Sequence, residues 1–123
     1  MNASDSKRIL IADADHKTRT MLGLMLAGEG YDVSHADTGR EAIALHDRKP
    51  HHLIITELGE DGFQVLSQLR RHASPVKFIS TFKTSRFPAK ICRRMGELLG
   101  AHCVLAKPVP PEQLLAAVRS ALD

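Results

Sequence analysis

Several side chains in this sequence could bind a metal ion or an anion if the fold brought them together. Three are carboxylates, two are hydroxyls and one is an ammonium: Asp13, Asp15, Glu57, Ser80, Thr81 and Lys107. Carboxylate oxygens coordinate hard cations, whereas hydroxyls and an ammonium group donate hydrogen bonds to anions. Because Lys107 is the natural counter-charge for the acids, we predict that it contacts Glu57.

Each of these side chains lies at the end of a short apolar run. The clearest run is Leu53–Thr56, which is typical of a strand buried on both faces of a parallel sheet. Runs of this kind alternate along the chain with helical patterns. The predicted strands cover about residues 8–13, 31–36, 52–57, 76–81 and 102–106, and the predicted helices about 16–29, 38–49, 63–72, 88–99 and 111–122.

This alternation predicts an α/β fold built from βαβ units. Right-handed crossovers place helices on both faces of the sheet. The expected architecture is a (βα)5 doubly wound, five-stranded parallel sheet with the flavodoxin-like strand order 2-1-3-4-5. In such sheets, ligands bind at the carboxyl ends of the strands where the order reverses, here between the strands that end at Asp13 and Glu57.

Some side chains receive a structural interpretation from their spacing alone. The helical periodicity predicts that Met21, Ile91 and Leu98 are buried. Cys92 and Cys103 form no CxxC pair and are interpreted as small buried hydrophobes, not as zinc ligands or a disulfide. The pair at 51–52 consists of histidines at the strand end away from the acids, so both are interpreted as surface residues or residues with satisfied hydrogen bonds.

The composition is that of an ordinary globular domain. The chain has 123 residues, of which 43% are hydrophobic and 25% charged, so we expect one domain over residues 1–123 with its core in about 7–122. No apolar run is long enough to span a membrane, and the polar first six residues do not form the apolar core of a signal peptide. We therefore expect a cytoplasmic protein with no membrane partner.

The charges are distributed unevenly along the chain. Residues 62–111 contain nine Lys and Arg residues but only one acid, Glu97. Five of these cations lie close together around the fourth predicted helix: Lys83, Arg86, Lys90, Arg93 and Arg94. They form either a solvated helix face or a docking surface for an acidic protein. Nucleic acid is a less favoured partner, because no helix-turn-helix or other reading motif follows.

The sequence from about residue 7 onward resembles the receiver domain of bacterial two-component response regulators. The stretches that carry the resemblance are Ile9–Asp13, Gly30–Val33, Ala36–Ala42, Asp61–Phe63, Gly100–Ala101 and Lys107–Pro108. In that family, an aspartate at the end of the third strand accepts a phosphoryl group from a histidine kinase, and two acids after the first strand hold Mg²⁺. A Ser or Thr on the fourth strand, here Ser80, and a Lys before a cis-proline, here Lys107 before Pro108, bind the phosphoryl oxygens.

The sequence departs from the family pattern where the chemistry is carried out. Glu57 occupies the phosphoacceptor position, and Ala14 replaces the acid that is the more direct Mg²⁺ ligand. Thr81 stands where a smaller residue is usual, Val104 replaces the aromatic residue on the fifth strand, and the loop after Glu57 is shorter than usual. The extra methylene of glutamate moves the carboxylate by about 1.5 Å, which is costly in a reaction that depends on positioning.

The resemblance and its departures lead to three hypotheses. The first is a non-enzymatic receiver that has lost phosphotransfer and binds a histidine kinase, an output protein or a second copy through the fourth helix, the fifth strand with Val104, and the fifth helix. Asp13 is then at best a weak metal ligand, and Mg²⁺ binding is possible but weakened by Ala14. The second is a working phosphoacceptor that uses Asp13, Asp15 and a carboxylate at Glu57 or Asp61. The third is a nucleic-acid binder that uses the basic face.

Overall fold

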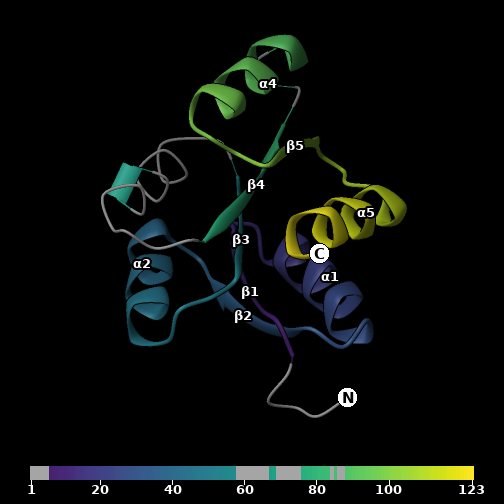
Figure 1. The fold of residues 1–123 in the computed structure, drawn as a ribbon. Helices are drawn as coiled ribbons and strands as arrows, with labels where there is room; N and C mark the ends of the chain where they lie inside the picture. Colours follow the sequence, from purple (N-terminus) through teal and green to yellow (C-terminus); the bar gives the residue numbers. More distant parts are fainter. Residues whose placement is uncertain (1–5, 58–66, 69–75, 84, 86–87) are drawn as a thin grey trace.

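The computed structural model describes residues 6–57, 67–68, 76–83, 85 and 88–123 (Figure 1). The strands are β1 (Arg8–Ala12), β2 (Asp32–Ala36), β3 (Leu53–Glu57), β4 (Lys77–Phe82) and β5 (Cys103–Ala106). The helices are α1 (His16–Gly28), α2 (Gly39–Arg48), α4 (Ala89–Leu98) and α5 (Pro111–Leu122). The five strands are parallel and have the order β2-β1-β3-β4-β5, which confirms the predicted topology. The helix predicted over 63–72 lies outside the described residues except for positions 67 and 68, which are helical.

The helices cover both faces of the sheet, with α1 and α5 together on one face and α2 on the other (Figure 1). Alternate residues of β1 and β3 therefore enter two different cores. Ile9, Ile11 and Ile55 pack with α1 and α5, whereas Leu10 and Ile54 pack toward α2. Since both faces are covered, these strands are continuous apolar runs, as the sequence indicated.

Local signals in the sequence set the helix ends. Thr38 precedes α2, and its Oγ1 accepts a hydrogen bond of 3.2 Å from the backbone N–H of Glu41, which satisfies a donor in the first turn. After α1 and α4 the chain turns at Gly30 (φ 93°) and Gly100 (φ 85°), in the left-handed region that favours glycine. Both helices therefore end within one residue of their predicted ends at about 29 and 99.

The predicted burial of three helix residues is wrong. Met21 is 54% exposed, Ile91 48% and Leu98 64%. The reason in α4 is that the helix contacts the sheet through Cys92 and Gly96 instead. A Cβ atom at Gly96 would overlap the side chain of Val104, so the missing side chain is what allows this close approach of α4 to β5.

Phe82 also departs from the prediction, which ended the fourth strand at Thr81 and placed Phe82 in the following loop. It is the last residue of β4 and is 1% exposed. The strand extends this far because β5 runs beside it and the backbone N–H of Lys107 donates to the carbonyl of Phe82 at 2.8 Å. Phe82, Cys92 and Val104 together form a small core under α4.

Candidate functional site

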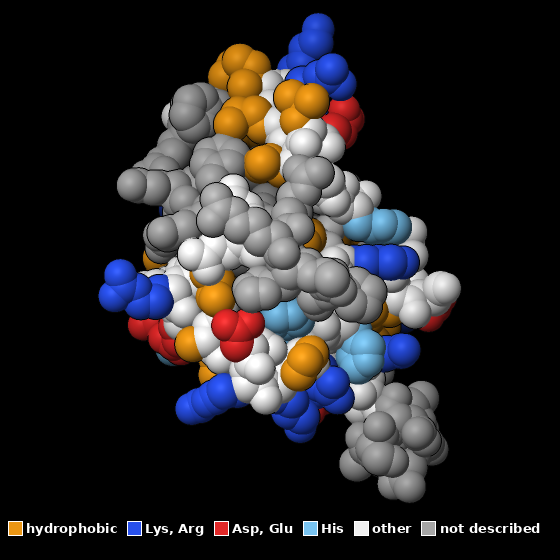
Figure 2. Space-filling model, turned by 60° about the vertical axis from the view of Figure 1, so that its left-hand side comes forward, with side chains coloured by type: hydrophobic (Ala, Val, Ile, Leu, Met, Phe, Trp, Pro, Cys, Tyr) orange, Lys and Arg blue, Asp and Glu red, His pale blue; other side chains and the backbone are white. Residues whose placement is uncertain are grey.

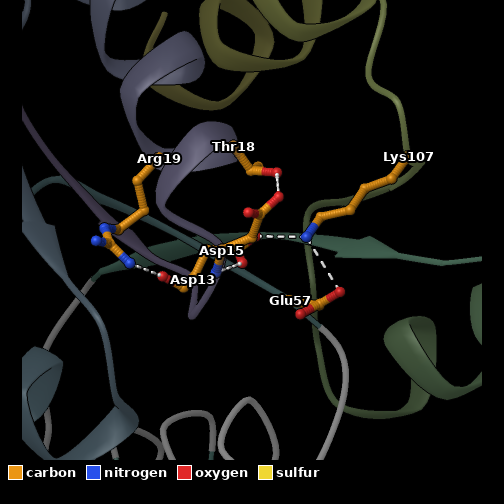
Figure 3. Close-up of polar contacts among 6 residues, drawn as sticks. All are labelled: Asp13, Asp15, Thr18, Arg19, Glu57 and Lys107. Atoms are coloured by element: carbon orange, nitrogen blue, oxygen red, sulfur yellow. Dashed lines mark hydrogen bonds and ion pairs between the residues drawn. The ribbon is translucent and has the colours of Figure 1, made fainter.

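Three strand ends meet at the ammonium group of Lys107 (Figure 3). Lys107 Nζ donates to Asp13 Oδ2 at 2.6 Å and to Glu57 Oε1 at 3.0 Å. The side chains of Asp13 and Lys107 are 3% and 8% exposed, whereas that of Glu57 is 27% exposed. The predicted contact between Lys107 and Glu57 is therefore present, and Asp13 is a second partner that the prediction did not name.

The sheet register explains why these residues meet. β1 and β3 are neighbours and pair Ala12 with Thr56. The next residues along the two strands, Asp13 and Glu57, therefore lie side by side at the carboxyl end of the sheet. Lys107 follows β5 and precedes Pro108 through a cis peptide bond. Because β4 lies between β3 and β5 in the sheet, this side chain extends past the end of β4 to reach the two acids. Figure 3 shows its ammonium group between them. The topological switch point thus brings together charges that are remote in sequence.

Both oxygens of the Asp13 carboxylate already have hydrogen-bond donors. Oδ2 accepts from Lys107, and Oδ1 accepts from the backbone N–H of Asp15 at 2.9 Å. The backbone carbonyl of Asp13 accepts from Arg19 Nη1 at 2.6 Å. Arg19 was missed by sequence reasoning; its place in the first turns of the helix after the acids was the only available signal. These bonds fix Asp13 in one orientation.

Asp15 does not join the group of Asp13, Lys107 and Glu57. It precedes α1, and its Oδ2 accepts from the Thr18 hydroxyl at 2.6 Å (Figure 3). This hydrogen bond is the main reason why the pKa of Asp15 lies below its usual value. Asp15 is the N-cap residue of α1, but its side chain makes no capping hydrogen bond to the backbone, so a helix-start pattern does not by itself predict the bond to Thr18.

Ser80 and Thr81 lie at the end of β4, next to the acids. The register pairs Thr81 with Glu57 and Ser80 with Thr56. The two residues are 0% and 1% exposed, and neither hydroxyl has a hydrogen-bond partner in the part of the chain that the structure describes. A buried polar group without a partner costs about 1–3 kcal/mol. Both hydroxyls therefore lie beside Glu57 with an unused capacity to form hydrogen bonds.

The donors at this edge do not fit a Mg²⁺ ion, which needs near-octahedral oxygen ligands at about 2.0–2.1 Å. Asp13 is occupied by Lys107 and the Asp15 N–H, Ala14 has no ligand atom, and Asp15 binds Thr18. Among the described residues, no group of three or more His, Cys, Asp or Glu side chains could hold a metal ion. The cation beside these acids is the ammonium of Lys107.

An open cavity of about 350 Å³ lies beside this site. It is lined by Asp15, Thr18, Met21, Leu22, Lys83, Ser85, Lys107, Pro108 and Val109. The exposed Met21 thus lines this cavity instead of packing in the core. Lys83, which the sequence assigned to the basic face, also faces the cavity and adds a second cation near Lys107.

The basic face is centred on α4. Lys90, Arg93 and Arg94 are exposed and lie beside the exposed apolar Ile91 and Leu98. Figure 2 shows orange and blue side chains gathered at the top of the molecule, where α4 lies in Figure 1. The predicted face therefore contains apolar groups as well as cations.

Arg93 and Val104 connect the basic face to the small core beneath α4. Arg93 Nη1 donates to the carbonyl of Val104 at 3.2 Å, and its guanidinium lies 5.6 Å from the centre of the Phe82 ring. Val104 itself is 8% exposed, so it supports the predicted face from below. Arg86 lies outside the described residues.

The chain matches the model of a known protein family. The family model described as the response regulator receiver domain matches residues 9–119. The chain belongs to this family. As a receiver domain it is a module of two-component signalling, and the resemblance inferred from the motifs is confirmed at that level.

Individual relatives of this receiver domain agree with the assignment. It is 33% identical over 121 residues to the transcriptional regulatory protein PcoR of Escherichia coli, covering 94% of this chain and 51% of PcoR. The chain spans about half the length of the curated transcriptional regulators that it matches. Among solved structures, the chemotaxis response regulator CheY4 of Vibrio cholerae has a TM-score of 0.83 at 27% identity, covering 95% of this chain and 99% of CheY4.

A third relative is a CheY-like response regulator receiver domain protein from Methanospirillum hungatei. Its crystal structure superposes with a TM-score of 0.85 at 25% identity, covering 97% of this chain and 95% of that protein. Within the described part of this receiver domain, every helix is too short or too polar to cross a membrane.

Proposed function

We propose that this receiver domain does not take up a phosphoryl group and instead signals by binding another protein, without catalytic activity of its own. The observation that carries the proposal is the pairing of Lys107 with both Asp13 and Glu57. The group that would hold a transferred phosphoryl oxygen is already occupied by the side chain at the acceptor position.

The length of Glu57 argues against phosphoryl transfer. Its carboxylate reaches about 1.5 Å further than that of an aspartate on the same backbone. In-line transfer depends almost entirely on positioning, and a displacement of this size costs about 10²-fold in rate. In addition, Oε1 lies 3.0 Å from Lys107 Nζ, so this oxygen is engaged in an ion pair and is not free to attack phosphorus.

The same geometry argues against tight Mg²⁺ binding. A metal ion would have to displace Lys107 from Asp13 and would find no ligand on Ala14. Asp15 would have to leave the Thr18 hydroxyl to take part. Without the metal, the charge that develops on a transferred phosphoryl group is neutralised only in part.

Glu57 can also be viewed as a permanent substitute for the phosphorylated state. In that state an anion at the end of β3 would meet Lys107, and here the Glu57 carboxylate already does so. We therefore propose that the domain has one fixed signalling state, which its partner reads without a phosphorylation signal.

The partner surface that we favour is the α4–β5–α5 side. Exposed Ile91 and Leu98 supply apolar area, and the cations of α4 attract an acidic surface. A histidine kinase, an output protein or a second copy of the chain are the candidate partners. Nucleic acid is less favoured, since the exposed apolar side chains add nothing to phosphate binding.

Incubation with Mg²⁺ and a small phosphodonor, followed by intact-mass analysis, tests the proposal. The natural chain should gain no phosphoryl group. The variant Ala14→Asp/Glu57→Asp, which restores both acids, is the matched control and should gain one. A phosphoryl group on the natural chain, mapped to Glu57 or Asp61, would instead establish the alternative that the domain is a working phosphoacceptor with atypical ligands.

A further inference from the structure

A second charged cavity lies at the amino ends of the strands, whereas Lys107 lies at their carboxyl ends. It has a volume of about 310 Å³ and is lined by Lys7, Arg8, Pro50, His51, His52, Lys77, Ala121 and Leu122. Arg8 and Lys77 are the first residues of β1 and β4, and the histidines directly precede β3. The cavity is therefore formed at the amino ends of three neighbouring strands, near the lower end of the sheet in Figure 1.

The lining carries only one sign of charge. Lys7, Arg8 and Lys77 are cationic, and no acid of the described residues lines the cavity. The positive charges are close enough to act on one another. After burial, the nearby Lys7 and Arg8 are what lower the pKa of His52.

The same holds for His51, whose pKa is lowered to about 4 by burial, His46 and Arg8. Among the charged groups that act on it, Asp32 has the opposite effect but does not compensate for the cations. A bound anion would relieve this repulsion.

The polar groups of the cavity are held in place before any ligand arrives. Arg8 donates to the carbonyl of Pro50 through Nε at 2.9 Å and Nη2 at 2.7 Å, which fixes the guanidinium plane. The backbone N–H of Arg8 donates to His52 Nδ1 at 2.9 Å, which fixes that ring. Preorganised donors lose little conformational entropy on binding, which favours a true site over a loose cluster of charges.

His51 is the most buried ionisable residue of the cavity lining. It is 7% exposed, its ring stacks on His46 with centroids 5.7 Å apart, and its backbone N–H donates to His46 Nδ1 at 3.0 Å. Its own Nδ1 is buried without a hydrogen-bond partner in the described part of the chain. Buried polar atoms of this kind are uncommon in folded proteins, which makes His51 an unusual member of the cavity lining.

We propose that this cavity binds a small molecule that carries phosphate groups, with its anionic oxygens on Lys7, Arg8 and Lys77. Ala121 and Leu122 at the end of α5 give the cavity an apolar wall, which suits the non-phosphate part of the ligand. The volume lies at the lower end of the range for small-molecule sites, which is about 300–1,000 Å³. The site is separate from the Lys107 group, and neither proposal depends on the other.

Nuclear magnetic resonance of the labelled full chain tests this site, with pyrophosphate, adenosine diphosphate and sulfate as probes. Salt is held at about 100 mM, where the Debye length is about 10 Å, so diffuse attraction is screened. Pyrophosphate should cause saturable shifts at His51, His52, Lys77 and Leu122. Tighter binding of the nucleotide than of pyrophosphate would assign the apolar wall a role, whereas equal affinities would restrict the site to the phosphate groups.

Matched variants separate a site from general attraction. Lys77→Gln should weaken pyrophosphate binding about fivefold to tenfold, the equivalent of one screened charge-assisted hydrogen bond. Lys17→Gln removes the same charge from an exposed position of α1 outside the cavity and should change the affinity less than twofold. Equal effects of the two variants, or shifts that do not saturate, would overturn the proposal.

The protonation of His51 is a second readout. Because a bound anion stabilises the charged imidazole, saturating sulfate, which keeps its charge across this range, should raise the pKa of His51 by at least one unit. The ring carbon resonances of His51 report this titration directly. An unchanged pKa of His51 at saturation would contradict binding in this cavity.

Discussion

Replacement of Lys107 by methionine should destabilise the fold more than replacement of Glu57 by glutamine. The substitution keeps the apolar stem but removes the ammonium, so the Asp13 carboxylate, which is 3% exposed, keeps only the Asp15 N–H as a partner. Removal of one member of a buried ion pair costs about 3–5 kcal/mol. Because Glu57 is 27% exposed and can be hydrated, we expect a loss near the lower limit, about 3 kcal/mol at pH 7.

The variant Glu57→Gln should behave differently. Lys107 then keeps its 2.6 Å contact with Asp13, and the repulsion between the two carboxylates disappears. The expected change is a loss of about 0–1 kcal/mol, the value for a partly exposed pair. In Lys107→Met/Asp13→Asn the unpaired buried charge is absent as well, so this double variant should recover part of the stability lost in Lys107→Met.

Urea unfolding followed by circular dichroism measures these differences, with Lys17→Met as the control for the loss of a surface lysine. The melting temperature of Lys107→Met should fall by roughly 10 °C, as expected for about 3 kcal/mol in a domain of this size. If Glu57→Gln is as destabilising as Lys107→Met, or if Lys107→Met loses less than about 1 kcal/mol, Lys107 does not compensate a buried charge and the reasoning is refuted.

Three further predictions concern other parts of the molecule. His51 has a pKa of about 4 in the folded chain against about 6.5 when unfolded, so the unfolded state binds a proton first as the pH falls. The free energy of unfolding should therefore fall by about 1–2 kcal/mol between pH 6.5 and 4, after solvent screening is allowed for. In urea unfolding at several pH values, His51→Asn should remove this part of the pH dependence. Gly96→Ala should lower the stability by about 1 kcal/mol despite a better helix propensity, because the new Cβ overlaps Val104. The same change should cost less when it is made in a Val104→Ala chain, where the overlapping methyl group is absent. Ile91→Ser/Leu98→Ser should leave the urea unfolding midpoint nearly unchanged because both side chains are exposed. In surface plasmon resonance, the same variant should bind a protein partner at least tenfold more weakly, a loss of about 1.4 kcal/mol. The control Leu24→Ser, at an exposed leucine of α1, should not change this affinity.

The framework of the fold could be predicted from the sequence because its signals are local. An apolar run such as Ile9–Ala12 is buried on both faces of a parallel sheet wherever it is placed, and the glycines after α1 and α4 end those helices whatever surrounds them. The strand order also followed, since right-handed crossovers leave few arrangements for five alternating strands and helices.

The burial of individual side chains could not be predicted in the same way. The apolar stripe of α4 extends beyond the surface that β4 and β5 cover, so Ile91 and Leu98 stay exposed while the helix packs through Cys92 and Gly96. Similarly, His46 was not recognised as buried; its ring stacks on His51, five positions away, and its Nδ1 accepts the backbone N–H of His51. Whether a side chain is buried depends on which neighbouring element covers it, and the periodicity of apolar residues carries no information about that neighbour.

The sequence by itself determined that carboxylates, hydroxyls and an ammonium would lie at the carboxyl ends of the strands, because the position of a residue at a strand end follows from the strand pattern. It also determined the residue types, including Glu57 and the missing acid at Ala14. Only the tertiary structure decided that Lys107 is shared by Asp13 and Glu57 while Asp15 turns to Thr18. Contacts of 2.6–3.0 Å between residues so far apart in the chain depend on strand register and side-chain rotamers, and these are set when the elements pack together.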